Sequence, residues 1–452
     1  MENSLKHPKL ETFFTIITII LMIILPVLEL IGTFLNKKFF YQEQILSFFG
    51  IFLSGLLIIY LLYNIIKKNF KLTLSDIFIV LSIIFCIISI KFSKNIMKSL
   101  NGEYGYSETP LQVLAYFSLF IISSIIYSEK NKKKILYTFI YLGIFECFIA
   151  FLQNFRLWPI SSLFDKAAHT KNHLAFGLTE HCNYFATLAI IFTAIFSGLF
   201  IYEKEKNDFI TFLLLSILGC FAGLFTYTRI AMVGLFSIIF GFLLLETLIK
   251  IYKKDKINFK KHIKNILILL LCFILCFIII EIFTGRIGKE ISTSVSEINK
   301  SQKENNIESL ATGRGTIWKV GLSSLKKYPL TGVGFDNYRY SFKIYPKNFG
   351  WSQNKGHNEY IHMLVTQGIP SGVNYLIFTF YCCLFPLIKI LKRESEFSKS
   401  NLTKIFLIAI FAYFVQSLFN SSVTNVAPYK WILMGLLLPR LEQKNLLNFK
   451  KK

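Results

Sequence analysis

Residues 183–201 read NYFATLAIIFTAIFSGLFI and contain no charged side chain. About 20 consecutive apolar residues match the hydrocarbon thickness of a bilayer when they form an α-helix. Within lipid, only a helix or a closed barrel satisfies the hydrogen bonds of its own backbone, and a run of this length is too long for a barrel strand. The segment therefore predicts a transmembrane helix.

Runs of this kind recur along the whole chain and are separated by short, Lys-rich stretches. Of the 452 residues, 54% are hydrophobic, and the mean hydropathy is +0.52. The chain is thus far more apolar than a soluble globular protein. We expect an all-α, polytopic membrane protein with about twelve transmembrane helices. Their predicted ranges are 13–35, 45–66, 73–92, 109–127, 135–154, 183–201, 208–227, 230–250, 264–284, 371–391, 404–420 and 427–439.

Positively charged residues predict the orientation of these helices. If the N-terminus is cytoplasmic, 28 Lys and Arg residues lie on the cytoplasmic side and 10 lie in the short outer loops. The other 12 lie in one long outer loop, which the positive-inside rule largely ignores because long loops are translocated regardless of charge. Both termini are therefore predicted to be cytoplasmic. Lys-rich loops beside anionic lipid explain much of the net charge of +24, so that charge does not indicate nucleic-acid binding.

These assignments divide the chain into three parts. Residues 1–284 are expected to form transmembrane helices 1–9, residues 285–357 a large helical extracytoplasmic loop, and residues 358–452 transmembrane helices 10–12 and a cytoplasmic tail. The loop carries 12 Lys or Arg residues against five acidic ones, a net charge of +7. Apolar residues recur at helical spacing within 314–325, which predicts an amphipathic helix there.

Three residues at the borders of these segments are candidates for chemistry. Arg229 lies in TYTR at the start of a predicted span, where a charge is costly and marks either a function or a side chain that reaches back to the interface. Arg314 lies in GRGTIW in the outer loop and, taken alone, is a solvated arginine. His357 begins HNEYIHMLVTQG just before the tenth span. Near neutral pH, histidine is the side chain best suited to take a proton from a hydroxyl.

The order of the surrounding motifs is more specific than any one of them. Thr-x-Thr-Arg at 226–229 is followed by Gly-Arg-x-x-x-Trp at 313–318, Pro-Leu-x-Gly-x-Gly at 329–334 and His-Asn-x9-Gly at 357–368. This ordered set resembles the O-antigen ligase and O-antigen polymerase superfamily of bacterial envelope glycosyltransferases. The resemblance covers about 225 to 372 motif by motif. Where the ligases have Gly, Thr or Tyr after the last motif, this chain has Ser371, which favours the polymerase over the ligase.

The resemblance implies a C-type glycosyltransferase-like fold and a metal-independent, inverting transfer. The donor would be a glycan on a polyprenyl (undecaprenyl) pyrophosphate, and the acceptor a sugar hydroxyl, at the outer face of the bacterial cytoplasmic (inner) membrane. Such enzymes build lipopolysaccharide or capsule. Membrane lipid and either a growing glycan or a lipid A-core acceptor would be the partners. No Asp-x-Asp pair occurs in the chain, so a divalent-metal site for nucleotide sugars is not expected. No cofactor is expected either.

The same resemblance assigns roles to individual residues. His357 would be the catalytic general base on the acceptor hydroxyl. Arg229 and Arg314, with Arg286 as a weaker third, would bind the pyrophosphate, since arginines meet its growing charge with paired donors. Asn183 matches the Asn-containing start of the family's sixth span. Asn358 marks the start of a helix whose N-terminal dipole would add to the phosphate site.

The sequence leaves the role of two further groups of ionisable residues undecided. Glu29 and Glu146 lie inside apolar spans, where they would either line the cavity and pair with a buried arginine or serve as hydrogen-bonded structural carboxylates. His169, His173 and His181 share one loop, but their spacing fits no standard set of metal ligands.

The sequence leaves the acceptor and two other functional classes open. A ligase, a polymerase and an enzyme that glycosylates protein side chains share this fold and chemistry and differ in the acceptor. A lipid-linked oligosaccharide flippase would handle the same lipid without forming a bond. A non-enzymatic scaffold would explain the hydrophobicity but not the Arg and His motifs.

Overall fold

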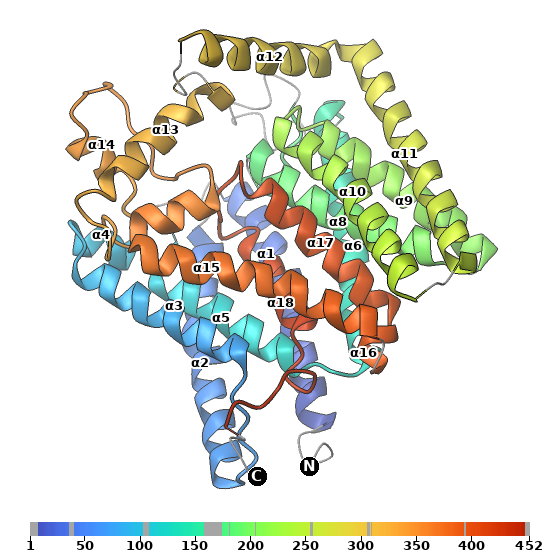
Figure 1. Cartoon of the computed structure of the whole chain (residues 1–452), viewed down its shortest axis with the longest axis horizontal. Helices are drawn as coiled ribbons and strands as arrows, with labels where there is room; N and C mark the ends of the chain where they lie inside the picture. Colours follow the sequence, from blue (N-terminus) through green and yellow to red (C-terminus); the bar gives the residue numbers. More distant parts are fainter. Residues whose placement is uncertain are drawn as a thin grey trace.

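The computed structural model describes residues 8–35, 40–102, 108–157, 174–179, 181–203, 205–253, 256–304, 308, 310–392 and 395–447. Within these ranges the regular secondary structure is helical throughout (Figure 1). The helices are α1 (Pro8–Phe34), α2 (Phe40–Ile66), α3 (Leu74–Lys91), α4 (Ile96–Asn101), α5 (Pro110–Ile125), α6 (Glu129–Asn154), α8 (Cys182–Tyr202), α9 (Lys206–Leu224), α10 (Arg229–Lys253), α11 (Lys256–Thr284), α12 (Arg286–Glu304), α13 (Leu310–Ser324), α14 (Tyr340–Ile344), α15 (Glu359–Lys392), α16 (Glu396–Lys399), α17 (Asn401–Gln416) and α18 (Ala427–Leu437).

The polytopic, all-helical prediction is confirmed for the described residues. Eight helices, α1, α2, α3, α6, α8, α10, α11 and α15, are long and apolar enough to cross a membrane. Three shorter apolar helices, α5, α9 and α17, and the short α18 fall in the remaining predicted ranges. A helix thus occupies each predicted range, whereas the number of helices that cross the membrane stays a prediction.

Helix α8 forms the centre of the bundle, and 94% of its apolar stretch is buried. Small residues allow its neighbours to approach closely, as is common between helices in membranes. A Cβ atom at Gly198 of α8 would lie 2.7 Å from the side chain of Ile405 in α17. A Cβ atom at Gly234 of α10 would lie 2.5 Å from the side chain of Ile190 in α8. Helices α10 and α17 therefore pack tightly against α8.

Helix α15 is divided by a kink at Gly368, where φ is +85° and ψ is 170°. The Pro-Leu-x-Gly-x-Gly turn at 329–334 packs directly against this kink. The Ile369 amide donates to the Pro329 carbonyl at 2.8 Å, and the Val333 amide donates to the Val365 carbonyl at 2.9 Å. The kink explains why the apolar span is predicted from 371, although the helix begins at Glu359.

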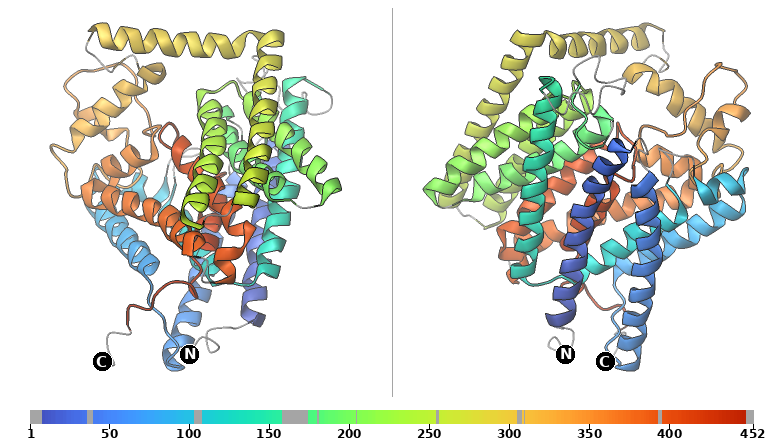
Figure 2. Two further views of the ribbon diagram at one scale, coloured as in Figure 1. Left: turned by 45° about the vertical axis from the view of Figure 1, so that its right-hand side comes forward. Right: turned by 180° about the vertical axis from the view of Figure 1, so that it is seen from behind.

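Helices α12, α13 and α14 gather at one end of the bundle, and α12 lies across that end (Figures 1 and 2). The start of α1 and the segment after α18 lie at the opposite end. This arrangement agrees with two termini on the same side of a membrane; which side faces the cytoplasm stays a prediction. Helix α13 covers most of 314–325, where an amphipathic helix is expected, and buries Ile317 and Val320.

Candidate functional site

His357 lies in the turn that precedes α15. Its backbone is in the left-handed region, with φ at +47°. The ring is partly buried, and its Nδ1 atom is shielded from solvent without a hydrogen-bond partner among the described residues. Burial, followed by the charges of Arg314 and His181, lowers the pKa of His357 to about 4. The ring is therefore neutral at pH 7 and can accept a proton.

Arg314 lies in α13, close enough to His357 for its charge to act on the imidazole. Its guanidinium donates to the carbonyl oxygen of Phe419, in the loop between α17 and α18, at 2.7 Å. Burial, followed by the positive charge of Arg229, lowers the pKa of Arg314. Three segments that are remote in the sequence thus bring His357, Arg314 and Arg229 into one electrostatic neighbourhood.

Arg229 is the first residue of α10, and its guanidinium contacts carboxylates of α12. Nη1 and Nη2 donate to the two oxygens of Glu297 at 2.7 and 3.1 Å, and Nε donates to Glu290 at 3.2 Å. The two glutamates are seven residues apart and therefore lie on one face of α12. Sequence reasoning did not identify these partners, although the spacing of Glu290 and Glu297 was a signal that could have indicated them.

Arg286, the first residue of α12, lies over the ring of Tyr227 at 4.7 Å from its centroid. It borders a groove of about 660 Å³ whose polar lining residues are Asn154, Tyr227, Thr284 and Arg286. The other lining residues are apolar, and five of them are phenylalanines: Phe151, Phe155, Phe221, Phe225 and Phe283. The groove has the size of a ligand pocket and an amphiphilic lining.

The two candidate asparagines have defined contacts. The carbonyl oxygen of Asn183, in the first turn of α8, accepts from the Asn420 side chain at 3.0 Å. Asn183 therefore touches the same loop whose Phe419 carbonyl accepts from Arg314. The Oδ1 atom of Asn358 accepts from the Ile361 amide at 2.9 Å, so Asn358 caps the start of α15.

Glu146 has a contact of a different kind. Its Oε2 atom accepts from the Leu178 amide at 3.0 Å, and Gln153, two turns further along α6, accepts from the amides of Phe176 and Gly177. These bonds fasten the segment before α8 to α6. They favour the structural interpretation of the carboxylate over a pairing with a buried arginine.

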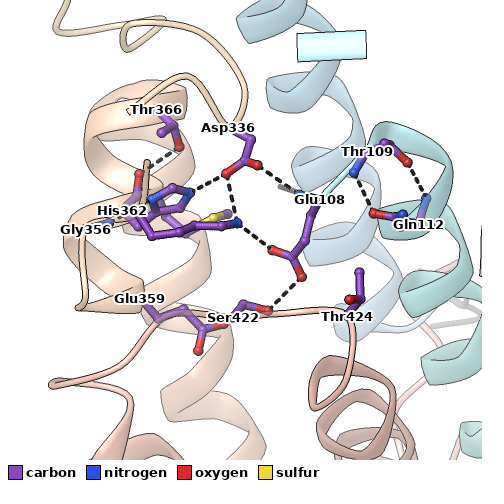
Figure 3. Close-up of polar contacts among 12 residues, drawn as sticks. Glu108, Thr109, Gln112, Asp336, Gly356, Glu359, His362, Thr366, Ser422 and Thr424 are labelled. Carbon is purple, nitrogen blue, oxygen red and sulfur yellow. Dashed lines mark hydrogen bonds and ion pairs between the residues drawn. The ribbon is translucent and has the colours of Figure 1, made fainter. Parts of the chain in front are cut away.

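A buried polar network around Asp336 and His362 was missed from the sequence (Figure 3). Asp336 accepts from Lys355 at 2.9 Å, from the Glu108 amide at 2.8 Å, and pairs with Nε2 of His362 at 3.0 Å. Burial opposes ionisation of Asp336, but Lys355 and the hydrogen bond from His362 lower its pKa to about 2. Burial opposes the charge of Lys355 too, yet Asp336 and Glu108 raise its pKa above the usual value.

A small cavity of about 60 Å³ adjoins this network and is lined by Glu108, Asp336, His362, Glu359 and Lys430, among others. It has room for a few water molecules and not for a sugar. Glu359 accepts from Tyr375 at 2.7 Å and from Tyr413 at 2.8 Å, and it pairs with Lys430. Buried charges in this part of the chain are thus paired and hydrogen-bonded.

The histidine group seen in the sequence contributes one described residue, His181, while His169 and His173 lie outside the described residues. The Nδ1 atom of His181 accepts from the Asn183 amide at 3.1 Å and caps α8. Across the described ranges, no group of three or more His, Cys, Asp or Glu side chains is placed to hold a metal ion.

Comparison with known proteins identifies a related family. Residues 212–376 match a family model described as O-antigen ligase. The matched segment contains Arg229, Arg286, Arg314 and His357, and the match confirms the resemblance to the O-antigen ligase superfamily. No curated protein sequence matches the chain.

Proposed function

Because residues 212–376 match the O-antigen ligase family model, we propose that the chain transfers a glycan from a polyprenyl pyrophosphate to a sugar hydroxyl. The observation that carries the proposal is the convergence of a neutral histidine with two arginines. Helix α13, which carries Arg314, contacts the turn of His357 through the bond from Trp318 to Gly356. The charge of Arg314 lowers the pKa of His357, and the charge of Arg229 lowers that of Arg314. This combination suits the transfer of a group from a phosphate leaving group to an alcohol.

In the proposed reaction the acceptor hydroxyl attacks the anomeric carbon of the donor sugar from the face opposite the pyrophosphate. The bond between that carbon and the phosphate oxygen breaks, and the pyrophosphate leaves with the electron pair. The configuration at the anomeric carbon is inverted because attack and departure occur on opposite faces, and His357 takes the proton of the attacking hydroxyl. A pKa of about 4 makes free His357 a weak base. Bound pyrophosphate would raise this pKa, because nearby negative charge favours the imidazolium.

Arg314 is the better placed of the two central arginines to bind phosphate in the state described. Its hydrogen bond goes to a neutral carbonyl, that of Phe419, rather than to a carboxylate. A pyrophosphate oxygen is a stronger, charge-assisted acceptor. Arg229 already makes a bidentate contact with Glu297. Carboxylate and phosphate present similar paired oxygens to a guanidinium, so donor binding to Arg229 would displace or loosen Glu297.

The Arg286 groove supports a lipid-linked donor. Its phenylalanine lining suits a hydrocarbon chain, and Arg286 at its polar rim suits a phosphate. Helices α6, α9 and α11, which supply most of the groove, are apolar. We place this region at the outer face of the cytoplasmic (inner) membrane with both termini inside, in agreement with the Lys and Arg distribution.

The acceptor is the second substrate of the proposed reaction. Ser371, the position that departs from the ligase pattern, is buried and donates to Gln367 of its own helix at 3.0 Å. This contact is internal to α15, so it provides no argument for an acceptor. A repeat-unit glycan, a lipid A-core sugar and a protein side chain remain the candidate acceptors, and the polymerase interpretation rests on the sequence pattern alone.

A transfer assay separates the enzyme from a flippase. Purified protein in nanodiscs would receive a polyprenyl-pyrophosphate-linked glycan and a panel of the three acceptor classes. The proposal predicts that free polyprenyl pyrophosphate and a longer glycan or glycoconjugate appear together, in equal amounts, with one acceptor class. If the lipid moves between leaflets of a proteoliposome while no glycosidic bond forms with any acceptor, the chain is a flippase and the proposal is wrong.

A further inference from the structure

The backbone at His357 is in a conformation that a residue with a Cβ atom rarely adopts, with φ at +47°. Such a conformation persists only when the surrounding structure holds it. The preceding residue, Gly356, is the point at which the turn is held. Its carbonyl oxygen accepts from Nε1 of Trp318 at 2.9 Å, and its amide donates to Nδ1 of His362 at 3.3 Å.

The hydrogen bonds of His362 define which of its nitrogens carries the proton. Because Nδ1 accepts from the Gly356 amide, the ring proton must lie on Nε2, which then donates to Asp336 at 3.0 Å. A second proton on Nδ1 would face the Gly356 N–H group and abolish that bond. Tyr338 stacks on the imidazole, with ring centroids 5.6 Å apart and planes within 10°.

Two further segments of the chain hold Asp336. It accepts from Lys355 and from the Glu108 amide, the second of which Figure 3 shows between labelled residues, and the backbone of Asp336 has a φ of +47°. Lys355 and Gly356 are consecutive, so the two residues before His357 are both tied to the Asp336–His362 pair. A Cβ atom at Gly356 would come within 3.0 Å of the Tyr338 ring, so no larger residue fits this turn without movement.

We infer that Asp336 and His362 are positioning residues that hold Gly356, and through it His357, in the geometry required for glycan transfer. Trp318 holds the same residue from the other side. The inference rests on the proposed role of His357, and it adds a residue pair that acts on the site without touching the substrate. The four-residue spacing of Arg314 and Trp318 puts both on one face of α13, where Trp318 bonds to Gly356 and the charge of Arg314 acts on His357.

Two substitutions at one position separate the bond to Gly356 from the bond to Asp336. In His362→Asn the amide oxygen stands at the position of Nδ1 and can still accept from Gly356. In His362→Gln the amide nitrogen stands at the position of Nε2 and can still reach Asp336, but the acceptor for Gly356 is lost. If His362 acts through its bond to Gly356, and Asp336 only keeps the ring proton on Nε2, the asparagine variant retains function and the glutamine variant does not. If the network served stability alone, transfer activity would not be higher in the asparagine variant than in the glutamine variant.

We expect kcat to fall about 10- to 100-fold in His362→Gln and in Trp318→Phe, because a small displacement of a reacting group costs up to about 100-fold. The KM for the lipid-linked donor should stay within about twofold, since the arginine contacts are unchanged. His362→Asn should stay within about fivefold of the wild-type kcat. Ser89→Ala is the matched control, because Ser89 donates a buried hydrogen bond to the Thr366 carbonyl of α15 without contacting the turn.

A second measurement does not depend on transfer activity. Diethyl pyrocarbonate acylates neutral imidazole, and the rate at His357 can be followed by peptide mass spectrometry on protein in nanodiscs. A loosened turn should expose the ring, so the rate should rise several-fold in His362→Gln and Trp318→Phe and stay unchanged in His362→Asn and Ser89→Ala. Size-exclusion profiles would verify folding of each variant, and Trp318→Phe replaces His362→Gln if the latter does not fold.

The results distinguish the two claims. Equal kcat and equal His357 acylation in the asparagine and glutamine variants would overturn the positioning role, even if His357 itself is essential. If the wild-type protein transfers no glycan, or His357→Ala transfers it normally, the proposed function fails. In that case, a selective rise in His357 acylation in His362→Gln would still support the positioning of the turn.

Discussion

Arg229 of α10 and Glu297 of α12 form a bidentate ion pair, with Nη1–Oε2 at 2.7 Å and Nη2–Oε1 at 3.1 Å. The Glu297 side chain is 14% exposed and that of Arg229 is 24% exposed, so water screens the pair only in part. The pair connects the helix that carries the first motif arginine with the helix that lies across the end of the bundle (Figure 2). In the proposed function, pyrophosphate and Glu297 compete for the same guanidinium.

Glu297→Gln should therefore strengthen donor binding. Loss of a competing carboxylate at a partly exposed pair contributes up to about 1 kcal/mol, which corresponds to an approximately fivefold lower donor KM with little change in kcat. Steady-state kinetics with lipid-linked glycan would measure this effect. Glu308→Gln is the control, because Glu308 pairs with the more exposed Lys319. A raised KM in Glu297→Gln would show that Glu297 orients Arg229 for the donor instead of competing with it.

The lowered pKa of His357 predicts a pH dependence of stability. The group has a pKa of about 4 in the folded protein and about 6.5 when unfolded, so the unfolded chain binds more protons between these values. Stability should be fully present above pH 6.5 and decrease as the pH falls towards 4, by at most about 3 kcal/mol. Thermal unfolding in nanodiscs from pH 7.5 to 4.5 would measure it. His357→Gln should flatten the wild-type slope; an identical slope in both proteins would contradict the assignment.

Glycan transfer should not require a divalent metal. Arginine side chains carry the charge that a metal would otherwise supply to the leaving group, and the chain contains no Asp-x-Asp pair. Activity after treatment with EDTA should remain within about twofold of the untreated rate. Complete loss of activity that Mg²⁺ restores would reject this part of the mechanism.

The kink in α15 should be intolerant of any side chain at Gly368. Its φ of +85° is unfavourable for a residue with a Cβ atom, and that atom would lie 2.3 Å from the Leu330 carbonyl oxygen. Gly368→Ala should cost about 3 kcal/mol or more and lower the melting temperature by about 5 °C. It should also separate the 329–334 turn from α15 and reduce activity. Gly55→Ala is the control, because a Cβ atom there meets no atom within 4 Å. Equal melting temperatures would contradict the strained kink.

Hydropathy alone located the helices. Every segment that crosses lipid must be a long apolar helix, and each predicted run, such as 183–201, has that composition. Hydropathy placed the tenth span at 371–391, because residues 359–367 are too polar to register as part of a span. The start of a helix near Asn358 was expected from the His-Asn motif, and α15 begins at Glu359 and is redirected at Gly368, where the 329–334 turn packs on it. The fold was therefore predictable where one local property decides it, and not where a distant segment does.

The residues of the candidate site also differ in how far the sequence could predict them. Arg229, Arg314 and His357 could be proposed as site residues because each lies in a short motif that a single sequence displays. Asp336 and His362 form their bond across 26 residues, and Asp336 contacts Glu108 across 228, so no local pattern indicated the network. Glu297 contacts Arg229 across 68 residues: the seven-residue spacing of Glu290 and Glu297 indicated a shared helix face but not the arginine that this face meets. Contacts of this length depend on how the helices pack.

The central claim is that His357 performs chemistry while Arg314 binds the donor. Single-turnover transfer and donor binding, measured on the same nanodisc preparations of wild-type, His357→Ala and Arg314→Ala protein, test it most directly. His357→Ala should bind lipid-linked glycan within about threefold of wild type but transfer it at least about 100-fold more slowly. Arg314→Ala should lose binding itself. Near wild-type single-turnover transfer by His357→Ala would contradict the account.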